Sequence, residues 1–464
     1  MIEKTLGEIA GWTGADIGTS EIADVKIKGV SINSQTVVKG NLFIPLKGER
    51  RDGHEFVSQA FENGAAASLW QKDVPDPPEN VPLLFVDDTL GALQQLAKKY
   101  RESLPLKVVA VTGSNGKTTT KDMTAALLSA RYKVQKTLGN YNNHIGLPLT
   151  VLSLKEEIEL AVVEMGMNHF GEIDLLTKIA KPDVAVITNI GDAHLQELGS
   201  REGIAEAKLE ILNGLKNGGL FIYPGDEPLI RKKLGENSLP FEIRTFGKEK
   251  TNDIYVTKLE ADENGSVFTV NQAELTFRLP VPGHYNVLNA LAAMLVAQHF
   301  QVSFTEINDA FARIRLTEMR MELSPGINGS RILNDAYNAS PTSMKAVIDF
   351  VAGLTGVKKK IAVLGDMLEL GPEERKYHRE VGEHIDPEKI DYVYTYGGRG
   401  KWIAEGARTV LPASRVFSFT DKKELIRHLK PKLEPSTIVF VKASRGMKLE
   451  EVVKGITEPT DGKN

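Results

Sequence analysis

The chain has 464 residues, which at about 100 to 200 residues per domain predicts roughly three domains and excludes a peptide or a small disulfide scaffold. Its 57 basic and 61 acidic residues give a formal net charge of −4, so we expect no nucleic-acid partner and no broad attraction to an anionic membrane. The absence of cysteine excludes disulfides, thiolate catalysis and cysteine-ligated metals. It also fits a reducing compartment, and we expect a cytoplasmic location.

Apolar stretches of the chain are short. The first residues include the charged side chains of Glu3, Lys4 and Glu8 and lack an apolar run of signal length. The longest uninterrupted apolar stretch, Ala290 to Ala297, is far shorter than the roughly 18 residues that would indicate a membrane span. We therefore expect neither an export signal nor a membrane span.

Three segments follow one another along the chain. Residues 1–102 hold short β-like runs around a proline-rich loop at 75–80, which predicts a small α/β domain. In residues 103–316, and again in 317–464, buried-strand runs alternate with helical patterns, as in parallel sheets with helices on both faces. The predicted strands are 42–46, 83–86, 108–112, 160–164, 184–189, 331–335, 361–365, 392–396 and 437–441. We predict an α/β fold of three domains, the last two doubly wound.

A glycine-rich turn between a predicted strand and a predicted helix carries the strongest chemical signal. The run Val108-Val-Ala-Val-Thr-Gly-Ser-Asn-Gly-Lys-Thr118 is typical of a P-loop, whose backbone N–H groups and helix dipole converge on phosphate oxygens. Lys117 can then reach the β- and γ-phosphates, and the Thr118 hydroxyl can ligate Mg²⁺. Val111 stands where the generic P-loop has glycine, so this is not a generic GTPase or kinase loop. The alternative is a glycine-rich turn with a solvated lysine. The predicted nucleotide-binding residues of the loop are Gly113, Ser114, Asn115, Gly116, Lys117, Thr118 and Thr119.

Two further strand ends in the central segment carry polar side chains. Glu164 ends the predicted strand 160–164, and His194 follows the predicted strand 184–189. Open parallel sheets bind ligands at the carboxyl ends of their strands, so Glu164 is a candidate Mg²⁺ ligand. His194 taken alone would be interpreted as a structural loop histidine, but beside a P-loop it becomes a candidate ligand. Lys208 lies in a segment with a helical pattern, and this pattern alone predicts a solvent-exposed lysine.

The motifs Gly113-Ser-Asn-Gly-Lys-Thr-Thr-Thr120 and Asn189-Ile-Gly-Asp-Ala-His194 resemble those of the ATP-dependent Mur ligases, the cytoplasmic amide-forming enzymes of peptidoglycan precursor synthesis. The resemblance covers the whole chain. It implies that the domain at 1–102 holds the UDP end of the substrate and that the domain at 103–316 binds ATP. The domain at 317–464 would then be Rossmann-like and close over the cleft.

Further segments resemble the family member that adds D-alanyl-D-alanine to UDP-N-acetylmuramoyl-tripeptide. They are 139–148, 164–168, 334–341, 365–371 and 441–447. The Asp-Asn-Pro-Arg motif of the diaminopimelate-adding sister enzyme is absent from the sequence. The resemblance implies ATP and Mg²⁺ as cofactors and the nucleotide tripeptide and the dipeptide as substrates, and we expect a monomer. Whether the third residue of the tripeptide is lysine or diaminopimelate stays open.

The resemblance assigns roles around the phosphates. Lys117 resembles the phosphate-binding lysine, and Thr118 resembles the magnesium-ligating hydroxyl. Glu164 and His194 match the ligands of two magnesium sites. Lys208 matches a lysine that is carbamylated in sister enzymes, and a carbamate would give it the negative charge to hold a second Mg²⁺. The expected catalytic residues are Lys117, His194, Lys208 and Arg320.

Other expected nucleotide contacts lie in later segments. Asn286 and Asn289 are three residues apart, hence on one helical face, and resemble the adenine-contacting motif. The alternative is that these asparagines cap the helix, and Tyr285 stands where the family commonly has histidine. Arg320 matches the arginine that approaches the γ-phosphate from the C-terminal domain, and Asp335 matches the ribose-binding aspartate.

Expected substrate contacts lie in two places. Ser34 resembles a residue of the uridine-diphosphate-binding pattern, in which Asp-Ser-Arg is usual. Asn33 and Gln35 depart from that pattern, and the loss of its arginine weakens the case for a diphosphate clamp at this point. Asn140 and Asn143, in the segment 139–148, are the other expected contacts.

The resemblance also implies a mechanism. The tripeptide carboxylate attacks the γ-phosphate to give an acyl phosphate and ADP, and the dipeptide amine then displaces phosphate through a tetrahedral intermediate. Another Mur ligase or a folylpolyglutamate synthetase would keep the ATP site and change the acceptor, although the folate enzyme lacks a separate UDP-binding domain ahead of its P-loop. A P-loop switch protein, which gates partner binding, is the alternative that is not a ligase.

Overall fold

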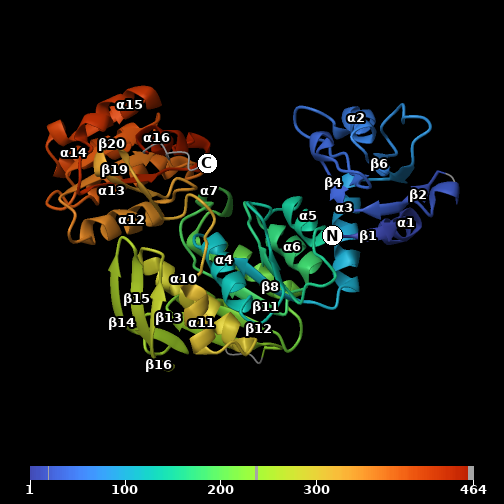
Figure 1. Ribbon diagram of the computed structural model, residues 1–464, viewed down its shortest axis with the longest axis horizontal. Coiled ribbons are helices and arrows are strands. Elements are labelled where there is room, and N and C mark those ends of the chain that lie inside the picture. The colour runs from blue at the N-terminus through green and yellow to red at the C-terminus, as the bar shows by residue number, and fades with distance from the viewer. Residues whose placement is uncertain (19, 236–238, 458–464) are drawn as a thin grey trace, which may run out of the picture.

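The computed structural model describes residues 1–18, 20–235 and 239–457, so the last seven residues of the expected C-terminal domain, 458–464, lie outside the described residues. Three α/β domains follow one another along the chain, and the central one lies between the other two (Figure 1). This confirms the predicted fold class. Among the described residues, no helix combines the length and the apolar character needed to cross a membrane.

The N-terminal domain is built on a mixed sheet with the strand order β2-β7-β6-β5-β4. The neighbours from β4 to β7 are parallel, β2 runs antiparallel to β7, and β1 pairs separately with β3. The predicted strand at 42–46 is shorter in the structure, because Pro45 has no N–H group for the ladder. The strands are β1 (Glu3–Thr5), β2 (Asp16–Ile17), β3 (Lys26–Lys28), β4 (Val30–Ser31), β5 (Leu42–Phe43), β6 (Ala67–Gln71) and β7 (Leu83–Val86). The helices are α1 (Leu6–Thr13), α2 (Val57–Glu62) and α3 (Thr89–Ser103).

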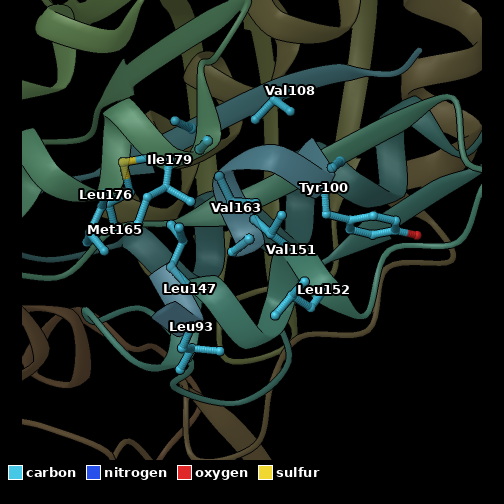
Figure 2. Close-up of a cluster of buried hydrophobic side chains, with 14 of the residues drawn as sticks. Leu93, Tyr100, Val108, Leu147, Val151, Leu152, Val163, Met165, Leu176 and Ile179 are labelled. Atoms are coloured by element: carbon cyan, nitrogen blue, oxygen red, sulfur yellow. The ribbon is translucent and has the colours of Figure 1, made fainter. Parts of the chain in front are cut away.

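Helix α3 joins the first domain to the second. Its Tyr100 hydroxyl donates to the Leu154 carbonyl at 2.7 Å, and Nε of Arg101 donates to the Ala180 carbonyl at 3.0 Å. Leu93 and Tyr100 pack into the same buried cluster as Val163 of the central sheet (Figure 2). The helix therefore belongs to the packing of both domains, and the proposed boundary near residue 103 stays a prediction.

The central domain contains a long sheet with the order β16-β15-β14-β13-β12-β11-β8-β10-β9. The strands from β9 to β14 in this order are parallel, as expected for a parallel sheet, although only β8, β10 and β11 among them were predicted. Strands β14, β15 and β16 form an antiparallel extension that the sequence patterns did not predict. The strands are β8 (Lys107–Thr112), β9 (Val134–Lys136), β10 (Leu160–Glu164), β11 (Val184–Ile187), β12 (Leu220–Pro224), β13 (Glu242–Gly247), β14 (Ile254–Asp262), β15 (Gly265–Val270) and β16 (Ala273–Leu279). The helices are α4 (Lys117–Leu128), α5 (Gly146–Leu152), α6 (Glu172–Ala180), α7 (Leu195–Leu198), α8 (Arg201–Leu209), α9 (Pro228–Leu234), α10 (His284–His299) and α11 (Phe304–Phe311).

Alternate residues of the central strands enter two different cores. Val108 and Ala110 pack with α3, α5 and α6 on one face, whereas Val109 and Val111 pack with α4, α10 and α11 on the other. Both faces are apolar because both are covered by helices, which explains the continuous hydrophobic runs in the sequence. Because helices cover both faces of the sheet, polar side chains can cluster only at the ends of its strands.

The C-terminal domain repeats this construction. Its strand order is β17-β18-β22-β19-β20-β21, all parallel except β17 against β18. Helices α12 to α14 cover one face and α15 and α16 the other, as predicted for a doubly wound domain. The strands are β17 (Glu322–Pro325), β18 (Arg331–Asn334), β19 (Lys359–Gly365), β20 (Tyr392–Tyr396), β21 (Val416–Phe419) and β22 (Thr437–Lys442). The helices are α12 (Pro341–Gly353), α13 (Glu374–Glu383), α14 (Gly400–Val410), α15 (Lys422–Leu429) and α16 (Glu450–Ile456).

Candidate active site

A cleft of about 560 Å³ lies between the central and C-terminal domains. Most of the predicted nucleotide-binding and metal-binding residues line it, although they come from segments far apart in the sequence. The predicted residues in its wall are Ser114, Asn115, Gly116, Lys117, Thr118, Thr119, Asn143, Glu164, His194, Asn286, Asn289, Arg320 and Asp335.

The P-loop adopts the predicted strand, turn and helix, with β8 ending at Thr112 and α4 beginning at Lys117. Gly113 has φ of +151°, and a Cβ there would lie 1.8 Å from Oγ1 of Thr188. Gly116 has φ of +79°, and a Cβ there would lie 2.4 Å from Oδ1 of Asn289. Both positions therefore require glycine, which leaves the backbone N–H groups uncovered for a ligand.

The segment after β11 holds the P-loop in shape. Asn189 accepts a hydrogen bond from the Asn115 N–H at 2.9 Å and donates to the Asn115 carbonyl at 3.0 Å. The Gly191 N–H donates to Oγ of Ser114 at 2.9 Å. The strand predicted to reach residue 189 ends at Ile187, because the next residues turn to make these contacts. The motif 189–194 thus acts on the loop directly.

Lys117 and Glu164 form the charged floor of the cleft. Nζ of Lys117 donates to the Gly113 carbonyl at 2.7 Å. Burial lowers the pKa of Lys117, an effect that Glu164 opposes and Arg320 reinforces. Glu164 is 2% exposed, and its Oε1 accepts a hydrogen bond from Nδ2 of Asn142 at 2.8 Å. Its Oε2 is buried, with no hydrogen-bond partner within the described parts of the chain.

His194 adopts a left-handed backbone, with φ of +66°, and turns its imidazole into the cleft. Burial lowers the pKa of His194 to about 4, and the charges of Lys117 and Lys208 contribute. The imidazole is therefore neutral at pH 7. Its Nδ1 lies 3.5 Å from Oε2 of Glu369, yet it makes no hydrogen bond to any residue that the structure describes.

Lys208 lies in α8 and is 1% exposed, which corrects its interpretation by pattern alone as a solvated lysine. It does not line the cleft itself. Burial lowers the pKa of Lys208 well below its usual value, and the charge of Lys117 adds to this effect. A lowered pKa favours the uncharged form of the amine, which is the form that can react with carbon dioxide.

The donor set fits Mg²⁺ only together with a phosphate. Within the described residues no group of three or more His, Cys, Asp or Glu side chains could hold a metal. Oε2 of Glu164 and Nδ1 of His194 are nevertheless buried polar atoms left without hydrogen bonds in that same part of the chain. Mg²⁺ usually keeps several waters and binds through one or two carboxylates plus substrate phosphates, so the sparse set is of the expected kind.

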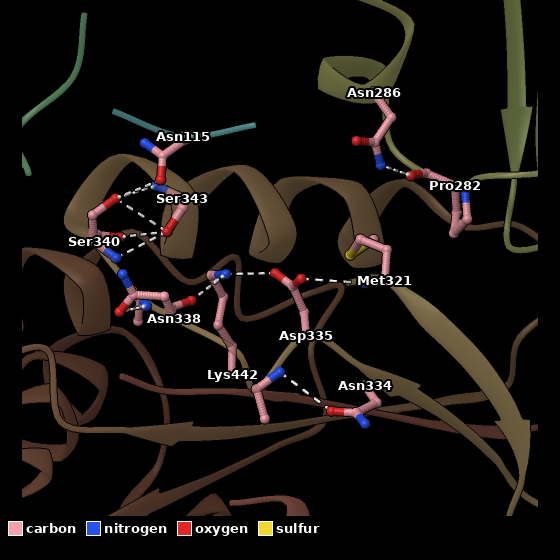
Figure 3. A network of polar contacts seen from close by, with 12 residues as sticks. Asn115, Pro282, Asn286, Met321, Asn334, Asp335, Asn338, Ser340, Ser343 and Lys442 are labelled. Carbon is pink, nitrogen blue, oxygen red and sulfur yellow. Dashed lines mark hydrogen bonds and ion pairs between the residues drawn. The ribbon is translucent and has the colours of Figure 1, made fainter. Parts of the chain in front are cut away.

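The C-terminal domain contributes a cation and a carboxylate. The Nη2 group of Arg320 donates to Oγ1 of Thr118 at 3.1 Å, and its guanidinium lies 4.0 Å from the ring centre of Tyr337. Asp335 forms an ion pair with Lys442 and accepts a hydrogen bond from the N–H of Met321 (Figure 3). Both side chains reach the cleft only because the two domains are in contact.

The two asparagines predicted to contact adenine lie inside α10 and are buried. Nδ2 of Asn286 donates to the Pro282 carbonyl at 2.6 Å (Figure 3), and Nδ2 of Asn289 donates to Oδ1 of Asn286 at 3.2 Å. Gly283 occupies the N-cap position without a side-chain cap, so the alternative of capping asparagines is wrong.

The predicted substrate contacts are only partly brought together. Asn143 lines the cleft, but Ser34 and Asn140 do not, and the Ser34 hydroxyl donates within the first domain to Oε1 of Gln59 at 2.7 Å. Sequence reasoning missed Asn142, which lines the cleft and binds Glu164. The three asparagines in the segment 140–143 were the available signal, but the sequence does not show which of their side chains faces the cleft.

Sequence models of one family match most of the chain. The matches are "Mur ligase family, catalytic domain" at residues 26–101, "Mur ligase middle domain" at 111–297 and "Mur ligase, glutamate ligase domain" at 319–445. The chain therefore belongs to the Mur ligase family, as its motifs predicted.

Relatives with a stated activity cover nearly the whole chain. It is 50% identical over 458 residues to the UDP-N-acetylmuramoyl-tripeptide--D-alanyl-D-alanine ligase of Bacillus subtilis, with 99% of each chain covered. A crystal structure of MurF from Acinetobacter baumannii matches with a TM-score of 0.87 and 31% identity, covering 99% of this chain and 100% of that one. The structure of MurF ligase from Thermotoga maritima in complex with ADP matches with a TM-score of 0.81 and 30% identity, covering 92% and 96%.

Proposed function

We propose that this chain is an ATP-dependent, ADP-forming ligase that joins D-alanyl-D-alanine to UDP-N-acetylmuramoyl-tripeptide in peptidoglycan precursor synthesis. The observation that carries the proposal is that this chain is 50% identical, over 99% of both chains, to a relative named for that reaction. The cleft supports the ATP half of the reaction independently, because a P-loop, a buried carboxylate and an arginine from a second domain converge there. The relative's name supports the identity of the acceptor.

The reaction needs ATP because a carboxylate is a poor electrophile toward an amine at neutral pH. Attack of the tripeptide carboxylate on the γ-phosphate breaks the bond between that phosphorus and the oxygen bridging it to the β-phosphate, which releases ADP and gives an acyl phosphate. The amine of the dipeptide then adds to the acyl carbon, loses a proton and expels inorganic phosphate. No covalent bond to the enzyme is required, so positioning and electrostatics supply the catalysis.

The residues of the cleft would divide this work. The N–H groups of the P-loop and the N-terminus of α4 would hold the β-phosphate. Lys117 would exchange its hydrogen bond to the Gly113 carbonyl for the γ-phosphate oxygens, while Arg320 would neutralise charge from the opposite domain. Asp335 would bind the ribose hydroxyls, and the side-chain amides of Asn286 and Asn289 in α10 would pair with the purine edge.

Thr118, Glu164 and His194 would hold Mg²⁺, with Lys208 joining them if it is carbamylated. Bound Mg²⁺ would withdraw charge from the phosphate oxygens as a Lewis acid. Oε2 of Glu164 and Nδ1 of His194, which are buried and make no hydrogen bond within the described residues, support this assignment. A carbamate on Lys208 would convert a buried amine into an anion beside the neutral imidazole.

One assay tests the proposed function against its rivals. ADP release is measured with the nucleotide tripeptide alone, with each amine of an acceptor panel alone, and with the tripeptide and one amine together. A ligase of the proposed specificity releases ADP only when the tripeptide and D-alanyl-D-alanine are both present. Release with another amine would indicate a different Mur-type ligase, and release indifferent to both substrates would indicate a switch protein. Tripeptides ending in lysine and in diaminopimelate identify the preferred third residue.

Several assignments stay predictions within this proposal. They are the division of the chain at residues 103 and 317, a cytoplasmic location, a monomeric state, and the contacts of Ser34, Asn140 and Asn143 with the nucleotide tripeptide. Ser34 would need the first domain to approach the central cleft before it could contact the same substrate, since it does not line the cleft. Asn140 belongs to the central domain and also lies outside the cleft wall.

A further inference from the structure

Asp122 of α4 is bound to the beginning of the C-terminal domain. The backbone N–H and the hydroxyl of Thr317 both donate to Oδ2 of Asp122, each at 2.8 Å. Thr317 lies between α11, the last helix of the central domain, and β17, the first strand of the next. One carboxylate oxygen thus receives two hydrogen bonds from the connection between the domains.

The other oxygen of Asp122 is bound within the central domain. Nζ of Lys136 donates to Oδ1 at 2.5 Å, and Nζ of Lys121 lies 3.5 Å away. The Asp122 side chain is fully buried. Burial alone would raise the pKa of Asp122, but Lys121 and Lys136 hold it below its usual value. A buried carboxylate with both oxygens engaged is rigid, because moving it would leave a charge without partners.

The same face of α4 carries a second contact to the connection. Thr118 precedes Asp122 by four residues, so the two side chains lie about one turn, or about 6 Å, apart along the helix. Thr118 accepts the hydrogen bond from Arg320, which follows Thr317 by three residues. The segment 317–320 therefore lies along α4. Its first residue is bonded to Asp122, and its last residue reaches Thr118 at the N-terminus of the helix, where the phosphates would bind.

We propose that Asp122 and Thr317 are positioning residues, which fix the pivot of the C-terminal domain on α4 and so hold Arg320 at the γ-phosphate. This inference rests on the proposed function, since it takes Arg320 as the group that meets the transferred phosphate. The contact of Arg320 with Thr118 is exchangeable, because the Thr118 hydroxyl is also the expected metal ligand. The contact of Asp122 with Thr317 has no such competitor and persists when Arg320 turns to the nucleotide.

Thr317→Val tests the inference with little risk to folding, since valine keeps the shape and the backbone N–H and removes only the hydroxyl. We expect kcat to fall about tenfold, and Thr317→Ser to restore it. Thr13→Val, which removes a hydroxyl bonded to the Ile9 carbonyl in the first domain, is the matched control and should leave kcat unchanged.

A double-mutant cycle separates positioning from a general structural role. In an Arg320→Lys background, Thr317→Val should lower kcat by less than about threefold, because the group that it positions has already been changed. An equal loss in both backgrounds, or an unchanged kcat in Thr317→Val alone, would overturn the inference.

A binding measurement keeps this result distinct from failure of the proposed function. The wild-type preference for a non-hydrolysable ATP analogue over ADP, measured by calorimetry without acceptor, should shrink about fivefold in Thr317→Val. A wild-type chain that binds the analogue but forms no amide would overturn the proposed function alone. An unchanged nucleotide preference in the variant would overturn the positioning role alone.

Discussion

Nδ2 of Asn142 donates a 2.8 Å hydrogen bond to Oε1 of Glu164, and this fixes the plane of a carboxylate whose Oε2 makes no hydrogen bond to a described residue and lies 3.8 Å from Nζ of Lys121. The amide acts on a candidate metal ligand from outside the ligand set. Residues in this position orient the ligand, and their loss typically lowers metal affinity by about 10- to 100-fold. The relationship therefore makes Asn142 a testable part of the site.

Asn142→Ala should raise the Mg²⁺ concentration needed for half-maximal ADP formation about tenfold, with a smaller effect at saturating Mg²⁺. The reason is that the Glu164 carboxylate would lose the bond that orients it. A Mg²⁺ titration of the initial rate measures the shift. Asn213→Ala, which removes an exposed amide bonded to Asp174, is the control. Identical titrations for wild type and Asn142→Ala would contradict this role.

Gly116→Ala should nearly abolish nucleotide use. The added Cβ would lie 2.4 Å from Oδ1 of Asn289 at a φ of +79°, so the loop or the amide must move. We expect kcat/KM for ATP to fall about 100-fold, the order of effect seen when a preorganised donor is lost. Gly218→Ala is the matched control, because it has a φ of +73° and its Cβ would meet no described atom within 4 Å. It should cost about 1 kcal/mol of stability and leave the rate unchanged.

Lys117→Ala should abolish ADP formation, because no other cation of the P-loop reaches the γ-phosphate in the proposed scheme. The measurement is acceptor-dependent ADP release at saturating ATP, with a thermal melt to confirm that the variant is folded. Near-normal turnover by the folded variant would remove Lys117 from the mechanism.

Lys208 should carry a carbamate when bicarbonate is present, because burial lowers the pKa of Lys208 well below its usual value and so favours the uncharged, nucleophilic form of its amine. Incubation with ¹³C-labelled bicarbonate should give a carbamate carbon signal in the NMR spectrum. Lys208→Arg should lose that signal, whereas Lys178→Arg, at an exposed position of α6, should keep it. A wild-type spectrum without the signal would refute the modification.

Local signals in the sequence were sufficient for the parts of the site that lie next to a strand end. The P-loop and Glu164 each follow an apolar run, and the chain alone shows that pattern. Asp335 ends the predicted strand 331–335, but its role came from the family resemblance. Lys442 pairs with Asp335 across 107 residues, and this partnership exists only because β18 and β22 are neighbours in the sheet. The burial of Lys208 likewise depends on tertiary packing, and its helical pattern alone predicted exposure.

Prediction of the fold was limited in the same way, because some strands can be recognised only when their tertiary partners are known. Continuous apolar runs identified the central parallel strands because both faces of that sheet are covered. The antiparallel extension formed by β14, β15 and β16 escaped prediction, because its residues alternate between more and less buried positions and only Ile254 of β14 is fully buried. Such strands resemble surface segments unless their pairing is known.

Asp183 stabilises the start of β8 through its charge. Its side chain is 10% exposed, accepts a hydrogen bond from the Val108 N–H at 3.0 Å and is bonded to Nζ of Lys107 at 2.9 Å and Nζ of Lys216 at 3.0 Å. Burial alone would raise the pKa of Asp183, but these donors outweigh it and hold the pKa below its usual value. A depressed pKa in the folded state means that the stabilisation is present above about pH 4 and is lost as the pH falls through the folded-state value.

Asp183→Asn should therefore lower the free energy of unfolding of the central domain by about 2 kcal/mol at pH 7, the scale of hydrogen bonds to a charged group. The difference between wild type and variant should stay constant from about pH 5 to pH 8 and shrink as the pH falls below about 4. The unfolded wild-type chain then takes up a proton at Asp183, which the folded carboxylate, with its lowered pKa, takes up only in stronger acid. Urea unfolding at a series of pH values measures it. Asp24→Asn, at an exposed position, should change stability by less than about 0.5 kcal/mol at every pH. A difference at position 183 that does not shrink in acid would show that shape or packing, and not charge, accounts for the role of Asp183.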